Sequence, residues 1–301
     1  MKSYLCDFLQ NFQFPDEAKT QLLAFYDELC EKDGSNLFSN YISEYKSGVV
    51  NYDAAIDKVK DLAGEKKISF FALALLYLIF IAEYLKIRYK KAGISENIWR
   101  DTISDLKYKA FDTKALYGVW GMKSVAFEKG VFEMKTFGFG KLQFKIEKFL
   151  GNYHKNGLHL EKHTPVLYVH VPKTGEKLDY EGVQSAYKRA AEFFKTQFRD
   201  IFKDRPMVFA FHSWLLFEKW KEVLSPQSNL MRFCGDYDVF ATGEYEDYST
   251  AWRIFDCPYE GDISKMPQDT SLRRACAQII QREEKLGWGW GVYCPELRNN
   301  D

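Results

Sequence analysis

The spacing of hydrophobic positions changes about two fifths of the way along the chain. In the first part, apolar residues recur at helical intervals, as Leu22, Phe25 and Leu29 do on one stripe of a predicted helix. Further on, apolar and polar positions alternate one by one, as in LQFKIE from Leu142 to Glu147. This alternation is typical of a half-buried strand. The pattern therefore predicts a helical domain over residues 1–117 and a domain containing a sheet over 118–301.

The second domain should follow an α+β plan, because its predicted strands alternate with helices. Strands at 166–171 and 207–211 flank a long amphipathic helix at 180–198, so the two strands should be parallel with a right-handed crossover. Outside this unit, the pattern favours a helix at 214–224, a strand at 251–255, a helix from Ser271 to about Lys285 and a closing strand in WGWGVY, residues 288–293.

One segment, ISFFALALLYLIFIA at 68–82, is apolar enough to raise the question of a membrane. A spanning helix needs roughly 20 apolar residues, and shorter runs are more often core helices. Lys66 and Glu83 bound this run, so a central helix surrounded by other helices is the better interpretation. The first residues do not resemble a signal peptide, and we expect a cytoplasmic protein.

Composition narrows the class of protein. Among 301 residues, the 42 Lys and Arg balance 42 Asp and Glu, and the formal net charge is zero. Nucleic-acid-binding proteins usually have a basic excess, so no nucleic-acid partner is expected. The six cysteines show no Cys-x-x-Cys spacing, which is the spacing of zinc knuckles and thioredoxin motifs. Free thiols fit a reducing compartment.

The stretch from Leu167 to Phe194 reads as strand, turn and helix. The turn contains Lys173, Gly175 and Lys177, and Asp179 is a plausible cap for the helix. Helix N-termini attract phosphate through free amides, the lysines add charge, and glycine permits close backbone approach. Because the complete GxGxxG and GxxxxGK[ST] motifs are absent, the residues of the turn favour an ordinary solvated turn over a phosphate site.

Two histidines end the two predicted parallel strands, His170 and His212. Ligands bind at the carboxyl edge of such sheets, so either imidazole is a candidate general base. The alternative is a hydrogen-bonded histidine near the core. Ser213 lacks the flanking glycines of a nucleophile elbow and is better explained as a helix cap. The remaining histidines lack metal-ligand spacing, and no metal site is expected.

Five short motifs occur in a consistent order and carry a family resemblance. They are GKLQFK at 140–145, VHVP at 169–172, HSWLL at 212–216, SN at 228–229 with Phe233, and TSLRR at 270–274. The sequence resembles a bacterial acyltransferase-like family that joins a helical N-acyltransferase N-terminal domain to a GNAT-like C-terminal domain. The resemblance covers most of residues 115–293, and the helical first third fits more loosely.

The resemblance implies a mixed sheet that is splayed at its centre and holds acetyl-CoA or a longer acyl-CoA as co-substrate. The acyl group would pass to an unidentified amine. The residues implied for CoA are Val169, Val171, Lys173, Thr174, Gly175 and Lys177. His170 or His212 would accept the proton of the amine, and Tyr237 would protonate the departing thiolate. The sequence lacks the usual Arg/Gln-x-x-Gly-x-Gly/Ala phosphate signature of GNAT proteins. A non-catalytic GNAT-shaped module that binds a ligand or protein is therefore the alternative. The resemblance suggests a small-molecule substrate and no membrane partner, and leaves the oligomeric state open.

Overall fold

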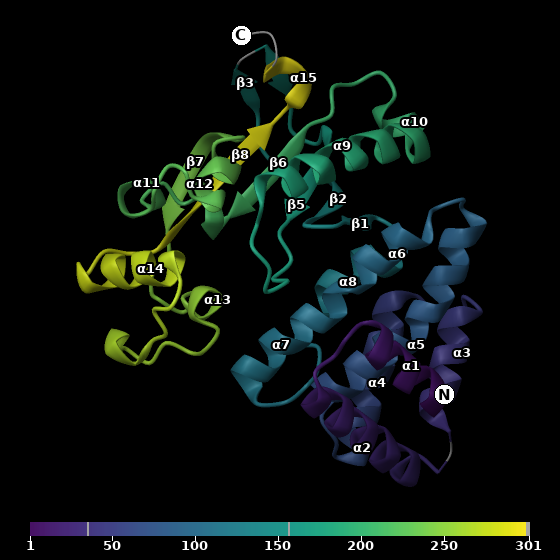
Figure 1. The fold of residues 1–301 in the computed structure, drawn as a ribbon. Coiled ribbons are helices and arrows are strands. Elements are labelled where there is room, and N and C mark those ends of the chain that lie inside the picture. Colours follow the sequence, from purple (N-terminus) through teal and green to yellow (C-terminus); the bar gives the residue numbers. More distant parts are fainter. Residues whose placement is uncertain (35, 156, 299–301) are drawn as a thin grey trace. The chain divides into compact units, whose positions relative to one another are not determined.

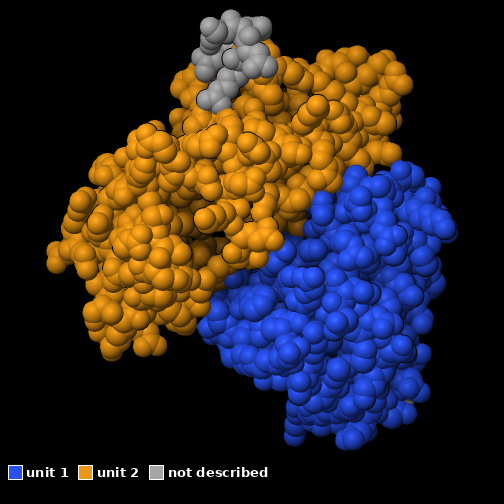
Figure 2. All heavy atoms as spheres, in the orientation of Figure 1, with its two compact units in different colours: residues 1–138 blue, residues 139–301 orange. Residues whose placement is uncertain are grey.

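The computed structural model describes residues 1–34, 36–155 and 157–298. It divides into two compact units, residues 1–138 and 139–301, which Figure 2 distinguishes by colour. The boundary predicted from the sequence, between 117 and 118, lies ahead of helix α8 (Val125–Phe132), which belongs to the first unit.

The first unit is helical and is built around one apolar helix, α5 (Phe70–Lys91) (Figure 1). Every residue of α5 from Ala72 to Ala82 is buried. The helix contacts each of the other helices described in this unit: α1 (Lys2–Asn11), α2 (Asp16–Lys32), α3 (Leu37–Lys46), α4 (Tyr52–Lys66), α6 (Glu96–Ile103), α7 (Asp105–Tyr117) and α8.

The burial of α5 answers the question that its composition raised. By length and hydropathy alone α5 could cross a membrane, but 67% of its most apolar window is buried inside the unit. The seven other helices surround the stretch from Ala72 to Ala82, where every side chain is buried, which explains why this stretch has no polar face. The interpretation of this segment as a central core helix is confirmed.

A six-stranded sheet has the order β1-β2-β5-β6-β8-β7 (Figure 1), and all of it lies in the second unit except residues 136–138 of β1, which come before the boundary. Strands β5 and β6 are parallel, and β2–β5, β6–β8 and β7–β8 are antiparallel. The strands are β1 (Thr136–Phe139), β2 (Leu142–Lys148), β5 (Pro165–His170), β6 (Phe209–Ser213), β7 (Asp238–Glu244) and β8 (Gly287–Tyr293). Strands β3 (Tyr153–Lys155) and β4 (Leu158–Leu160) form a separate hairpin. A helical domain followed by a mixed sheet confirms the predicted α+β class.

Helix α9 (Tyr180–Gln197) connects β5 to β6 and packs on one face of the sheet. Its Tyr187 ring lies against the rings of Phe144, Phe209 and Tyr293 from β2, β6 and β8. We call this the α9 face. A short helix, α10 (Arg199–Phe202), precedes β6. The helical elements described after β6 are η1 (Trp214–Leu216), α11 (Trp220–Val223), α12 (Asn229–Cys234), α13 (Trp252–Phe255), η2 (Ile263–Lys265), α14 (Ser271–Gln281) and α15 (Pro295–Arg298).

Strand β8 has two different faces because glycine alternates with larger residues. A Cβ at Gly289 would lie 2.3 Å from the carbonyl oxygen of Leu216, so only glycine lets η1 pack directly on the strand backbone. Trp288 and Trp290 fall on the opposite face because strand side chains alternate. The WGWG sequence thus places two indoles on one face and removes side chains from the other.

We expect Gly289→Ala to destabilise the protein by about 1–3 kcal/mol, the usual cost of forcing extra volume into a packed contact. The readout is the free energy of unfolding in urea. Gly34→Ala is the matched control, because a Cβ there would meet nothing within 4 Å. Equal stability of the two variants would contradict the contact between β8 and η1.

Several elements differ from the sequence prediction, including the following three. The predicted strand at 251–255 is instead the helix α13 (Trp252–Phe255), because Ala251, Ile254 and Phe255 are buried at helical spacing. The predicted helix at 214–224 is broken into η1 and α11. The edge strand β7 was missed, since a register shift between Val239 and Ala241 interrupts its alternation. As a result β8 lies inside the sheet, between β6 and β7.

Candidate active site

Strands β5 and β6 separate towards their carboxyl ends. In the described chain, their ladder pairs are Leu167 with Phe209 and Tyr168 with Ala210. Beyond these pairs β5 stays with β2 as far as His170, and β6 stays with β8 as far as Ser213. Each strand therefore keeps its outer neighbour while the two central strands diverge.

The divergence leaves main-chain groups facing the space between the strands. The amide of Leu167 points towards β6, donating to the carbonyl of Val208 at 3.0 Å. Because strand groups alternate with period two, the carbonyl of Val169 and the amide of Val171 point to the same side, past the last ladder pair. Val169 and Val171 are two of the residues that the family resemblance implies for CoA.

The loop after β5 is tied down by charge pairs. Lys173 pairs with Asp256, which also receives the Arg273 guanidinium at 2.6 Å. Glu176 pairs with Lys141. Thr174 accepts from the amide of Glu176 at 3.2 Å and so closes a turn. Of the two predicted phosphate lysines, Lys173 is therefore partly neutralised within the protein.

Two positions of this loop remain suited to an anion. Lys177 is exposed, and Gly175 has a φ of +76° with nothing within 4 Å of an added Cβ. The N-terminus of α9 is less open than expected. Asp179 caps it by accepting from the amide of Gly182 at 2.7 Å, and its carboxylate competes with phosphate for that end of the helix.

The two candidate histidines lie on the same face of the sheet, opposite the α9 face. Tyr168 and Ala210 pair across the ladder, so their side chains lie on the same face of the sheet. His170 lies two residues after Tyr168 and His212 two residues after Ala210, so both histidines share that face. We call this the histidine face. His170 is half-buried and pairs across the ladder with Gln143.

His212 is exposed at its edge but flanked by aromatic rings. Its imidazole lies 4.6 Å from the ring of Trp288 and 6.0 Å from that of Trp290, centroid to centroid. This partial burial lowers the pKa of His212 below 6.5. The imidazole is therefore mainly neutral at pH 7 and able to accept a proton.

Tyr237, the predicted acid, lies on the α9 face, so the structure does not bring it together with the histidines. Its ring packs against Phe211, and its hydroxyl lies 2.5 Å from that of Tyr187. Burial raises the pKa of Tyr237 well above 10, so it stays protonated. Its role as an acid remains a prediction.

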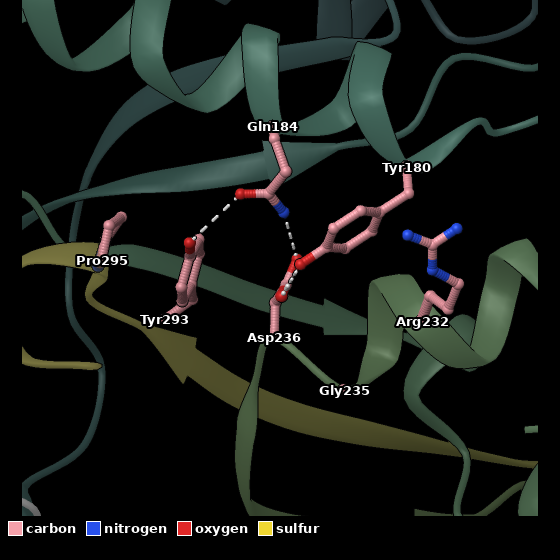
Figure 3. A pocket seen from close by; sticks show the side chains of 7 residues that line it. All are labelled: Tyr180, Gln184, Arg232, Gly235, Asp236, Tyr293 and Pro295. Carbon is pink, nitrogen blue, oxygen red and sulfur yellow. Dashed lines mark hydrogen bonds between the residues drawn. The ribbon is translucent and has the colours of Figure 1, made fainter. Parts of the chain in front are cut away.

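A cavity of about 700 Å³ opens on the α9 face. Figure 3 shows Tyr180 and Gln184 entering it from α9, Arg232 from α12, Asp236 from the following loop, and Tyr293 from β8. The sequence analysis did not predict this pocket, because its polar residues lie far apart in the chain and belong to no common motif. Within the described residues, no group of three His, Cys, Asp or Glu side chains is placed to hold a metal ion.

Comparison with known proteins places this geometry in a family. Residues 136–293 match the model of the GNAT-like C-terminal domain, more than half of the chain. The chain belongs to this GNAT-like family. Residues 4–126 of the GNAT-like chain match the N-acyltransferase N-terminal domain. The two-domain resemblance inferred from the motifs is confirmed.

Solved structures with the same fold span nearly the whole GNAT-like chain. One is an acyltransferase in complex with decanoyl-CoA and teicoplanin, with a TM-score of 0.70, 17% identity, and coverage of 96% of this chain and 86% of that one. Another is an acyltransferase mutant in complex with octanoyl-CoA, with a TM-score of 0.71 at the same identity and coverage. A search of curated proteins found no match.

Proposed function

We propose that the protein is an acyl-CoA-dependent N-acyltransferase that transfers an acyl group from the thioester to a small amine. The observation that carries this proposal is the divergence of β5 from β6 after Tyr168 and Ala210. An extended pantetheine arm bears amides that can bond to the main chain left facing that space, as a peptide adds to a strand edge.

The proposed roles follow from the placement of each group. The carbonyl of Val169 and the amide of Val171 would hold the pantetheine arm. Gly175 and Lys177 would bind the pyrophosphate, and Thr174 would shape the turn. Lys173, although paired with Asp256, would add a weaker electrostatic attraction to the phosphates. Main-chain amides near His170 would polarise the thioester carbonyl. His212 or His170 would take the proton of the attacking amine.

Several findings on related proteins support the proposal. The matched domains are described as an N-acyltransferase N-terminal domain and a GNAT-like C-terminal domain, and the structural neighbours bind octanoyl-CoA, decanoyl-CoA or CoA. We therefore propose a medium-chain acyl-CoA as well as acetyl-CoA as candidate donors. We also propose a cytoplasmic enzyme with a small-molecule acceptor and with neither a nucleic-acid nor a membrane partner.

The test is binding of acetyl-CoA, octanoyl-CoA and decanoyl-CoA, measured by thermal shift and calorimetry. A ligand at about 100 times its Kd should stabilise the protein by about 2.7 kcal/mol. Failure of all three to shift the melting temperature at millimolar concentration would sink the proposal. Binding without release of CoA thiol in the presence of any tested amine would favour the non-catalytic module instead.

Gly175→Asp should weaken acyl-CoA binding at least tenfold, because it places a carboxylate beside the phosphates. Gly157→Asp is the matched control: Gly157 also has a positive φ, +72°, and nothing within 4 Å of an added Cβ, but it lies in the β3–β4 hairpin. Calorimetric Kd values decide the outcome. Equal affinity of the two variants would refute the placement of the phosphates on this loop.

A further inference from the structure

Two indoles lie beside His212 on the histidine face. Trp290 pairs with His212 across the β6–β8 ladder, so their side chains share a face, and Trp288, two residues earlier in β8, shares it too. Both indoles are only partly buried, and His212 is exposed. We call Trp288 and Trp290 the indole platform. It forms the part of the histidine face next to the candidate general base.

The indole of Trp288 lies over the edge strand of the sheet. Gly243 of β7 pairs with Trp288 across the ladder. A Cβ on Gly243 would lie 2.5 Å from Cζ2 and 2.9 Å from Nε1 of this indole, so only glycine lets the ring rest on the β7 backbone. The ring of His212 lies 4.6 Å away at an interplanar angle of 71°. The strand backbone and the imidazole therefore set the orientation of Trp288.

The indole of Trp290 is fixed by other aromatic rings. Its centroid lies 5.4 Å from the ring of Phe149 and 5.0 Å from the ring of Phe240. These rings belong to the hydrophobic cluster that also contains Leu158 and Leu160 of the β3–β4 hairpin. Both indoles are thus held in place before any ligand arrives, which reduces the entropy lost on binding.

The positions next to the platform favour an uncharged, apolar ligand. Ala241 pairs with Trp290 across the β7–β8 ladder, and Gly243 pairs with Trp288, so neither neighbour offers a polar side chain. A flat ring placed here would gain from stacking and from apolar burial. The hydroxyl groups of a sugar would lose water on the same surface without gaining hydrogen bonds from these neighbours.

We propose that the indole platform selects the acceptor, and that the acceptor is a primary amine with an uncharged aromatic ring on a short alkyl chain. The ring would stack on the platform, and the amine would reach the imidazole of His212, whose centroid lies 4.6 Å from that of Trp288. This inference rests on the proposed acyltransferase function and names the class of amine that would be acylated.

The transfer step is balanced with these groups. The amine nitrogen forms a bond to the acyl carbon, and the carbon–sulfur bond of the thioester breaks, with its electron pair leaving on sulfur. His212 takes the proton from nitrogen, and a proton returns to the thiolate. The products are the amide and the free thiol of CoA, so no oxidant or reductant is needed.

The first experiment compares acceptors of similar size, with octanoyl-CoA as the donor and release of CoA thiol as the readout. Phenethylamine has a flat ring, cyclohexylethylamine has a saturated ring, and glucosamine has a polar ring. We expect the KM of phenethylamine to be about 3–10-fold lower than that of cyclohexylethylamine, in line with the contribution of aromatic pairing. Glucosamine should be a poorer acceptor than either. Equal KM values for phenethylamine and cyclohexylethylamine would overturn the proposal.

Variants then assign the preference to the platform. Trp288→Ala should abolish the difference in KM between the two amines, and Trp288→Phe, which keeps a ring, should retain part of it. Gly243→Ala should act like Trp288→Ala, because the added Cβ displaces the indole. Tyr117→Ala is the control, since it removes a 56% exposed aromatic ring from the first unit. A change that acts only through the pKa of His212 would alter the rates with both amines equally, and that result would refute selection by Trp288.

Direct binding distinguishes this inference from the acyltransferase proposal. Phenethylamine is titrated into the full chain, and the indole N–H signals are followed by NMR. We expect a saturable shift of the Trp288 signal, and no such shift with glucosamine at the same concentration. If octanoyl-CoA binds and thiol is released while Trp288 does not respond to phenethylamine, this inference fails and the acyltransferase proposal stands. If Trp288 responds but no acyl-CoA binds, the acyltransferase proposal and the acceptor role fail together, and only binding of the aromatic ring is supported.

Discussion

Lys109→Met is expected to destabilise the first unit by about 3–5 kcal/mol, the cost of leaving buried charge without its partner. The Lys109 ammonium lies 2.6 Å from the Asp105 carboxylate and pairs with Glu128 as well. Asp105 is 4% exposed and Glu128 is 1% exposed. Methionine fills a similar volume but leaves two carboxylates facing each other in a dry site. The measurement is the free energy of unfolding in urea.

Two controls separate charge from packing. Lys2→Met removes an ammonium from an exposed pair with Asp27 and should leave the melting temperature nearly unchanged. Adding Asp105→Asn and Glu128→Gln to Lys109→Met should restore much of the lost stability, because a neutral set of similar shape needs no counter-charge. If the triple variant is as unstable as Lys109→Met alone, the loss of stability comes from lost packing and not from unpaired charge.

The loss should also depend on pH. Burial raises the pKa of Glu128 above 4.5. A carboxyl whose folded pKa is raised stabilises the fold most when protonated, below its unfolded pKa, and this contribution is lost as pH rises through the folded pKa. Without Lys109 the pKa rises further, so the difference between wild type and variant should widen as pH rises from roughly 5 to roughly 8. A pH-independent difference would contradict this account.

Much of the fold could be predicted from the sequence because local signals and tertiary packing agree. The unbroken apolar run becomes α5, and the strand–helix–strand reading becomes β5, α9 and β6. One helix cap could be predicted too, because Asp179 accepts from the amide of Gly182 at the start of α9. Prediction failed where segments are short or irregular, as in α13, whose burial comes from tertiary contacts, and in the bulged edge strand β7.

Part of the candidate site could also be predicted from the sequence, and part could not. The period of two places His170 in step with Tyr168, so their shared face follows from the sequence once β5 is identified. The opposite placement of Tyr237 depends on the packing of the segment after α12 against the α9 face, which no local pattern encodes. The pocket on the α9 face could not be predicted from the sequence, since Gln184, Asp236 and Tyr293 come together only when three separate segments have folded.

His212→Ala should lower kcat/KM by about 10²–10⁴, the usual contribution of a general base. The affinity for acyl-CoA should change little, because the proposed donor contacts are main-chain groups of β5 and its loop. His170→Ala should have a smaller effect, since His170 is half-buried and less able to reach an incoming amine. His159→Ala, an exposed histidine of β4, is the control and should retain full activity. An equal fall in kcat/KM for His159→Ala and His212→Ala would refute the assignment of His212 as the general base.

The pH profile identifies the base more sharply than the loss of rate. Because partial burial lowers the pKa of His212, activity should decline only when pH falls below a value under 6.5, where the imidazole becomes protonated. Trp288→Ala exposes the ring and should raise this pKa towards 6.5, moving the acidic limb of the profile to higher pH. Titration of the imidazole by NMR should report the same shift. If the kinetic limb stays in place while the NMR titration of His212 moves, another group accepts the proton, and His170 becomes the residue to test.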